Sequence, residues 1–390
     1  MTPRGIDPLD YLEVDRLLTD EERDVRDAVR AFVSEQILPG IEGWFEAGEF
    51  PLEVAKGLAE LGLLGMHLTG YGCAGASAVS YGLTCRELEA GDSGFRSFVS
   101  VQGSLCMFPI WRYGSEEQKE RWLPAMGRGE VIGCFGLTEP DAGSDPGRMR
   151  TAARRDGSDW VLSGTKMWIT NGGIADLAVV WARTEEGIRG FLVPTDAPGF
   201  STRDVHRKLS LRASVTSELL LDEVRVPDEA VLPGVVGLKG PLSCLTEARY
   251  GIVWGAMGAA RACFETALRY AGDRVQWGRP IAGFQLTQAR LADMALELAK
   301  GSLLALHLGR MKDEGRLRPE HVSMGKLNNV REALRIAREA RSILGANGIT
   351  LEYPVMRHMN NLESVYTYEG TNEMHTLIVG EALTGLRAYE

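Results

Sequence analysis

The chain has 390 residues, enough to bury a large core and to divide into more than one structural unit. Its 43 basic and 53 acidic residues give a net charge of −10, which argues against nucleic acid as the main partner. No apolar run is long enough to span a bilayer, and residues 1–7 lack the apolar core of a signal peptide. A cytoplasmic location is expected, or the mitochondrial matrix if the chain is a mature eukaryotic form.

The six cysteines are scattered among apolar or small residues and form no CxxC pair. They are expected to be free, buried thiols in a reducing compartment. No group of histidines and cysteines has zinc spacing, so no metal site is expected. No Walker loop or strand-to-helix GxGxxG turn is present either.

Helical patterns dominate the first third of the chain. A capping box at 19–22 precedes apolar residues at helical spacing, and Pro39-Gly40 is expected to end that helix. A second capping box lies at 115–118. Further helical patterns cover about 51–64, 77–90 and 93–113.

The pattern changes near Val131. Short apolar or β-branched runs follow, separated by Gly, Asn, Asp and Pro, and they predict strands of an antiparallel sheet or barrel. Pro227 and Pro233 close this region. The predicted strands are 160–163, 177–181, 190–193 and 218–221.

Helical periodicity returns from about Pro241. One apolar stripe runs from 252 to 267, and a later stripe from 330 to 344 stops at Gly345. Pro319 suits the first position of a helix. Long helices with broad apolar faces predict a bundle. We therefore expect an α+β chain with a helical domain over 1–130, an antiparallel β domain over 131–235 and a four-helix-bundle-type domain over 236–390.

Glu369 is the first candidate catalytic residue. It lies between Tyr368 and Gly370, in a run from Leu362 to Leu377 with few other charges. A carboxylate in an apolar pocket has a raised pKa and can act as a general base, and a glycine lets another molecule approach closely. The alternative is a solvated loop acid beside a turn glycine.

Two upstream segments, 134–145 (CFGLTEPDAGSD) and 164–172 (GTKMWITNG), have the composition of a ligand-binding surface. Thr138, Ser144 and Thr170 can donate hydrogen bonds, and Trp168 offers a flat apolar surface. This chemistry suits a planar heterocycle that carries phosphates. Two ordinary turns with a core tryptophan are the alternative.

These two segments and the run YEGTNE at 368–373 resemble, in order, three motifs of the flavin-dependent acyl-CoA dehydrogenases. The resemblance extends from about Leu18 to the C-terminus. Runs 87–102, 247–252 and 361–371 are most similar to the glutaryl-CoA dehydrogenases of that family. The resemblance implies two helical domains flanking a β domain, FAD as cofactor, an acyl-CoA substrate and a homotetramer. It also implies an electron-transfer flavoprotein as electron acceptor, with oxygen as the alternative.

The resemblance assigns Glu369 the role of the base that removes the α-proton of the thioester. Arg96 and Ser100 match residues that hold the far carboxylate of glutarate, and Glu89 matches the acid near that arginine. At i and i+4 on a helix beginning near 93, Arg96 and Ser100 point to one side; a surface arginine is the alternative. Arg249 matches a contact to the CoA portion, with a core ion pair as its alternative. Further substrate candidates are Ser97, Ser144, Tyr250, Tyr368 and Gly370.

For FAD, the resemblance implies a site completed by a neighbouring subunit. Arg274 matches the arginine that reaches the pyrophosphate. Thr371 and Asn372 follow the base, and helix capping is compatible with that role. The family commonly has a second glycine where this chain has Ala346, which leaves the fit of that loop open. The β-domain candidates are Phe135, Leu137, Thr138, Gly143, Ser144, Trp168, Ile169 and Thr170; the adenine-side candidates are Gln285, Ser342, Leu344, Gly345 and Ala346.

The sequence thus predicts FAD-dependent oxidative decarboxylation of glutaryl-CoA to crotonyl-CoA and carbon dioxide. A dehydrogenase for another short or functionalised acyl-CoA is one alternative. A flavin- or CoA-binding regulator without turnover is another, although pure binding would not need a carboxylate at position 369.

Overall fold

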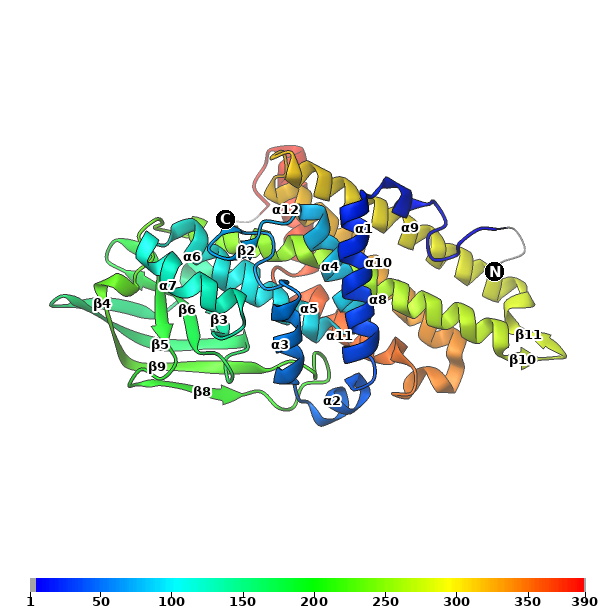
Figure 1. The fold of residues 1–390 in the computed structure, drawn as a ribbon, viewed down its shortest axis with the longest axis horizontal. Helices are drawn as coiled ribbons and strands as arrows, with labels where there is room; N and C mark the ends of the chain where they lie inside the picture. The colour runs from blue at the N-terminus through cyan, green and yellow to red at the C-terminus, as the bar shows by residue number, and fades with distance from the viewer. Residues whose placement is uncertain (1–4, 389–390) are drawn as a thin grey trace.

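The computed structural model describes residues 5–388. Residues 1–4 and 389–390 lie outside the described residues. The first predicted domain begins and the last one ends within these residues, and the expectation of no signal peptide concerns residues 1–7. Figure 1 shows a sheet at one end of the molecule, helices through the middle, and the small β10–β11 hairpin at the opposite end.

The first part of the chain is helical, as predicted. Both capping boxes are confirmed, because the hydroxyls of Thr19 and Ser115 accept hydrogen bonds from the backbone N–H groups three residues later. The first helix leaves the α geometry earlier than predicted, passing at Val33–Ile37 into a π-helical segment. The helices are α1 Asp20–Phe32, α2 Ile41–Ala47, α3 Leu52–Glu60, α4 Ala78–Gly91, α5 Ser93–Ser100, α6 Phe108–Tyr113 and α7 Glu116–Gly127.

The predicted helix over 93–113 is a composite. Helix α5 passes into a π-helical segment at Val101–Met107, which leads into α6. A two-stranded hairpin, β1 Thr69–Gly70 with β2 Cys73–Ala74, precedes α4. Helices α4 and α5 are separated only by Asp92, whose side chain caps α5 through the N–H of Gly94 at 2.8 Å.

A curled sheet of seven strands follows, with strand order β3-β6-β4-β5-β9-β8 and β7 paired to β6. Its pairings are antiparallel except for β3 with β6 and a single residue pair between β4 and β6, which are parallel. The sheet is therefore mixed where the sequence predicts antiparallel pairing throughout. The strands are β3 Gly133–Gly136, β4 Ala152–Asp156, β5 Asp159–Thr170, β6 Leu177–Thr184, β7 Gly187–Pro194, β8 Phe200–Asp204 and β9 Thr216–Pro227.

The C-terminal part is a set of long helices. Pro319 begins α10, as predicted, and the hairpin β10 Val275–Gln276 with β11 Arg279–Pro280 joins the first two helices. Apolar residues of α8, α9, α10 and α11 form one core. The helices are α8 Lys239–Asp273, α9 Gln285–Asp313, α10 Pro319–Leu344, α11 Pro354–Thr367 and α12 Asn372–Thr384.

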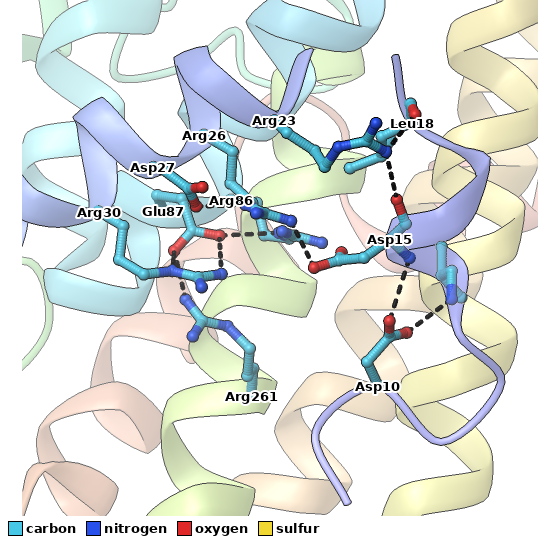
Figure 2. Close-up of polar contacts among 11 residues, drawn as sticks. Asp10, Asp15, Leu18, Arg23, Arg26, Asp27, Arg30, Arg86, Glu87 and Arg261 are labelled. Atoms are coloured by element: carbon cyan, nitrogen blue, oxygen red, sulfur yellow. Dashed lines mark hydrogen bonds and ion pairs between the residues drawn. The ribbon is translucent and has the colours of Figure 1, made fainter. Parts of the chain in front are cut away.

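A charged network joins the first helices to the C-terminal helices (Figure 2). Glu87 of α4 is almost completely buried and accepts hydrogen bonds from Arg30 of α1, Arg86 of α4 and Arg261 of α8. These arginines lower the pKa of Glu87 to about 2 against the opposing effect of burial. Residues two apart on a helix face roughly opposite sides, so Glu89 points away from this network.

The six cysteines are free, and all except the half-buried Cys73 are buried. Over residues 5–388, no helix is long and apolar enough to cross a membrane. No group of three or more metal-ligating side chains is found in the same range.

Candidate active site

Glu369 lies in the short connection between α11 and α12, in a left-handed backbone conformation with φ of 53°. Such a conformation is uncommon for a residue other than glycine and persists only where the surroundings hold it. Its carboxylate atom Oε2 is buried and has no hydrogen-bond partner among the described residues. Burial raises the pKa of Glu369, although Arg96, Lys326 and Arg249 oppose that rise.

Three consecutive backbone carbonyls around Glu369 are held by two cations. Lys326 of α10 donates to the carbonyls of Tyr368 and Gly370, the latter at 2.6 Å. Arg249 of α8 donates from Nε to the carbonyl of Glu369 itself at 2.6 Å. The loop that carries the candidate base is therefore fixed by side chains from two different helices.

Gly370 follows Glu369 with φ of 91°, a conformation that favours glycine. A Cβ at this position would lie 2.8 Å from Nε2 of His375 and 3.2 Å from Nη2 of Arg249. Burial lowers the pKa of His375 to about 3, so this ring is neutral at physiological pH. Gly370 thus lets the loop pack directly on α12 and on Arg249.

Arg96 is buried and forms an ion pair with the equally buried Glu89, with Nε and Oε2 2.7 Å apart. Its Nη2 donates to the hydroxyl of Tyr368, the residue before Glu369. No hydrogen bond from Nη1 to another described residue is present, so part of the guanidinium can still take an acceptor. The surface position considered as the alternative for Arg96 is not observed.

Two serines of α5 lie on the same part of the helix as Arg96. Ser97 Oγ is 3.5 Å from the hydroxyl of Tyr368, at the outer limit of a hydrogen bond. Ser100 is completely buried near the hydroxyl of Tyr81, and its own hydroxyl makes no hydrogen bond of normal geometry among the described residues. A buried hydroxyl without a partner is costly unless a ligand or water satisfies it.

The segment that leads out of β3 is anchored by a buried ion pair. Lys166 of β5 donates to Glu139 at 2.8 Å and to the carbonyl of Leu137 at 3.0 Å. Glu139 also accepts from the backbone N–H of Thr151 at 2.9 Å. Burial lowers the pKa of Lys166 to about 8. Against the effect of burial, the backbone N–H of Arg150 and these hydrogen bonds lower the pKa of Glu139 to about 2. Phe135 and Leu137 are buried here, Thr138 is half-buried, and Gly143 and Ser144 are exposed.

Trp168 lies where β5 leaves regular pairing with β9. The register shifts between Lys166 and Ile169, and Trp168 has φ of 63°. Trp168 is 58% exposed, whereas Ile169 is buried and Thr170 is half-buried. The core position considered as the alternative for Trp168 is not observed; an exposed indole at a bulge is a flat surface on which a planar ring can lie.

The structure does not bring the other predicted FAD residues to this surface within one chain. Arg274 and Gln285 flank the β10–β11 hairpin, at the end of the molecule opposite the sheet (Figure 1). Gly345 and Ala346 are exposed beyond the end of α10, and Ser342 accepts a hydrogen bond from Arg290 of α9. Trp277 at the hairpin tip is 86% exposed, and Leu286 in the first turn of α9 is 80% exposed.

Four of the candidates have structural positions in this chain. Tyr250 is fully buried, and its hydroxyl donates to the carbonyl of Ala78 at 2.7 Å, so it lies in the core. Leu344 is buried in the C-terminal core. Thr371 caps α12, accepting from the N–H of Met374, and Asn372 is the first residue of that helix. Arg249 donates to the carbonyl of Glu369, so it contacts the loop that carries the candidate base.

Sequence reasoning missed Lys326 and the pair Glu139–Lys166. A signal for Lys326 was present, because a lysine four residues from both Val322 and Val330 interrupts the apolar face of α10. Glu139 and Lys166 lie inside the segments 134–145 and 164–172 that predict the ligand-binding surface. Their pairing could not be read from the sequence, since it depends on how β3 and β5 lie in the sheet.

Three family models match the chain. They are the N-terminal domain of acyl-CoA dehydrogenase over residues 19–130, its middle domain over 134–224 and its C-terminal domain over 236–384. A solved structure of a glutaryl-CoA dehydrogenase from Mycobacterium smegmatis in complex with FADH2 is 64% identical, with a TM-score of 0.98, and the match covers 99% of this chain and 100% of that one.

A second solved structure of a glutaryl-CoA dehydrogenase from Mycobacterium smegmatis is 67% identical, with a TM-score of 0.97 and coverage of 98% and 99%. Among curated proteins, the mitochondrial short-chain specific acyl-CoA dehydrogenase of Bos taurus is 36% identical over 376 residues, which cover 94% of this chain and 90% of that protein.

Proposed function

This chain belongs to the acyl-CoA dehydrogenase family, and we propose that it converts glutaryl-CoA to crotonyl-CoA and carbon dioxide with FAD as cofactor. The observation that carries the choice of substrate is the buried Arg96–Glu89 ion pair. Arg96 also donates to the hydroxyl of Tyr368, the residue before Glu369. It supplies a fixed positive group, beside the candidate base, for the second carboxylate of a dicarboxylic acyl chain.

FAD is the cofactor, and the chain has residues that fit it. The exposed ring of Trp168 and the half-buried Thr138 and Thr170 present a flat surface with hydroxyl donors, and Gly143 has open space around its Cα. When bound, FAD supplies the acceptor for the hydride that leaves the substrate. Arg274 is proposed to reach the pyrophosphate from a neighbouring subunit, because it precedes the β10–β11 hairpin at the end of the molecule opposite the sheet (Figure 1).

Glu369 is proposed to take the α-proton of the thioester. Its Oε2 has no competing partner, and burial favours the neutral acid that forms on proton transfer. Arg96, Lys326 and Arg249 limit that effect, so that the carboxylate is still accessible as a base. The loop held by Lys326 and Arg249 keeps this carboxylate in place without a hydrogen bond to it.

Arg96 is proposed to hold the far carboxylate, with the buried Ser100 hydroxyl as a second donor. Oxidation gives an enoyl thioester with a γ-carboxylate, and loss of carbon dioxide leaves an electron pair that the thioester can accept. Uptake of a proton then gives crotonyl-CoA. Glu89 balances the charge of Arg96 once the substrate carboxylate has left as neutral carbon dioxide.

A dehydrogenase for another short acyl-CoA is the second candidate, favoured by the 36% identity to a short-chain specific enzyme. Anaerobic mixing of the FAD-loaded protein with glutaryl-CoA, butyryl-CoA and longer acyl-CoAs separates the two, with flavin bleaching as the signal. Bleaching and crotonyl-CoA formation fastest with glutaryl-CoA support the proposal. Preference for butyryl-CoA, with no carbon dioxide from glutaryl-CoA, would assign the chain to the second candidate.

A homotetramer that shares its FAD sites is proposed for the assembly, and an electron-transfer flavoprotein for the electron acceptor. The exposed apolar residues at the hairpin end, Val275, Trp277 and Leu286, support a subunit contact there. Sedimentation of the holoprotein tests the assembly, since a monomer that keeps FAD at full affinity would contradict a shared site.

A further inference from the structure

Lys326 is a buried cation whose hydrogen bonds end on backbone rather than on a carboxylate. It is 2% exposed, and its ammonium group donates to the carbonyls of Tyr368 and Gly370, which lie on either side of Glu369. Arg249 holds the carbonyl between them. Within residues 5–388, the structure shows no ion pair between Lys326 and an acidic side chain.

Burial of a lysine in this way is expensive unless something specific compensates it. Desolvation lowers the pKa of Lys326 to about 7; Glu369 opposes this effect, and the neighbouring Arg249 and Arg96 add to it. The positive charge is therefore present below about that pH. Removing a lysine from such a position would relieve that desolvation penalty. The penalty is therefore offset by the two hydrogen bonds and the charge that Lys326 brings to the 368–370 loop.

We infer that Lys326 is a positioning residue for Glu369: it fixes the loop from both sides and keeps a positive charge beside the carboxylate. This inference rests on the proposed role of Glu369 as base. Two consequences can be measured separately. The loop should open more often without the hydrogen bonds, and the acid–base behaviour of Glu369 should change without the charge.

The direction of the second consequence follows from the neighbouring charges. An ammonium group near a carboxylate favours the ionised form, so Lys326 lowers the pKa of Glu369. Proton abstraction needs the carboxylate, and flavin reduction should rise with pH as Glu369 ionises. Loss of the Lys326 charge should therefore move this rise to higher pH. The other groups that face Glu369 are Arg96, Glu89, Arg249, Tyr368 and the neutral His375.

The test compares Lys326→Met, Lys326→Arg and the wild-type FAD-loaded protein. For Lys326→Met, the rate of anaerobic flavin reduction by glutaryl-CoA at pH 7 should fall roughly 10- to 100-fold, because the base is no longer held in place. The rise of this rate with pH should move upward in Lys326→Met and stay near wild type in Lys326→Arg. Amide hydrogen exchange in peptides covering 366–375 should speed up in Lys326→Met, with peptides of β6 and β7 unchanged.

Lys208 provides a matched control elsewhere in the chain. It is a half-buried lysine in the connection between β8 and β9. It donates to the carbonyls of Leu211 and Ser214 at 2.9 and 2.6 Å and to the hydroxyl of Thr216 at 2.8 Å. Burial lowers its pKa to about 8. Lys208→Met removes hydrogen bonds that end on the connection between β8 and β9 and on the first residue of β9, and not on the 368–370 loop, so it should leave the pH dependence of flavin reduction unchanged.

A Lys326→Met protein with wild-type pH dependence and wild-type exchange at 366–375 would overturn the inference, whatever its rate. Should that variant not fold, Lys326→Gln serves as the second neutral variant, and an unmoved pH dependence in it overturns the inference equally. If none of the acyl-CoAs tested bleaches the flavin of the wild-type protein, the proposed function is rejected instead. The exchange comparison would still decide whether Lys326 holds the loop.

Discussion

Gly255 of α8 packs directly against the carboxylate of Glu89. A Cβ on Gly255 would overlap Oε2 of Glu89, and it would lie 3.0 Å from Cδ of Glu89 and 3.4 Å from Cγ of Arg96. The buried ion pair of Glu89 and Arg96 thus exists in its present position because the facing helix has no side chain there.

We expect Gly255→Ala to destabilise the protein by about 1–3 kcal/mol, because the buried Glu89 carboxylate cannot move aside without losing Arg96. Gly272→Ala on the same helix is the control, since a Cβ there meets nothing within 4 Å. That change should be neutral or stabilising by about 0.5–1 kcal/mol. Chemical denaturation of both FAD-loaded variants measures the difference, and equal effects would contradict the packing argument.

Glu369→Gln should keep FAD but lose flavin reduction by roughly 10²–10⁴-fold or more, because the amide cannot take the proton. Stopped-flow bleaching with glutaryl-CoA measures this loss. Glu373→Gln, an exposed acid in the first turn of α12, is the matched control and should reduce the flavin at the wild-type rate. Near-normal bleaching in Glu369→Gln would remove this residue from the role of base.

The test of Arg96 must take its partner into account. Arg96→Gln alone would strand the buried Glu89 carboxylate and confound specificity with stability. The double variant Glu89→Gln/Arg96→Gln removes both charges. Its kcat/KM for glutaryl-CoA should fall at least tenfold, since a charge-assisted hydrogen bond contributes about 1.5–3 kcal/mol. Butyryl-CoA should be much less affected, and equal losses on the two substrates would argue against carboxylate recognition.

Glu87 should make the stability of the folded protein depend on pH in the acidic range. Its pKa is lowered to about 2 in the folded protein, well below the value of about 4.3 in an unfolded chain. The stabilising contribution is therefore complete above the unfolded value and is lost as the pH falls toward 2. Glu87→Gln should be less stable at pH 7, and its stability should fall less steeply between about pH 5 and pH 2. Parallel acid-unfolding curves would contradict this prediction.

Arg274→Met should weaken FAD binding by roughly 10- to 100-fold if Arg274 contacts the pyrophosphate of a neighbouring subunit. Equilibrium dialysis of the apoprotein measures the affinity, and sedimentation shows whether the assembly persists. Arg316→Met is the control, because Arg316 is an exposed arginine that pairs with Glu314 in the turn after α9. Unchanged affinity in Arg274→Met would leave the hairpin without a role in the cofactor site.

The sequence by itself determined the order of helices, strands and helices, because capping boxes and apolar periodicity are local. Thr19, Ser115 and Pro319 begin helices where predicted for that reason. The sequence also pointed to Glu369, Arg96 and Trp168, since the motifs around them are contiguous. It could not show that β3 pairs in parallel with β6, because that register depends on which strands meet.

Only the tertiary structure decided which groups surround Glu369. Arg249, Lys326 and Arg96 come from three helices far apart in the sequence, and each approaches the 368–370 loop through packing that no local pattern encodes. The same holds for Tyr250, whose burial beside Ala78 makes it a core residue. A side chain's chemistry is fixed by its type, but its pKa and its partners are set by neighbours that folding brings together.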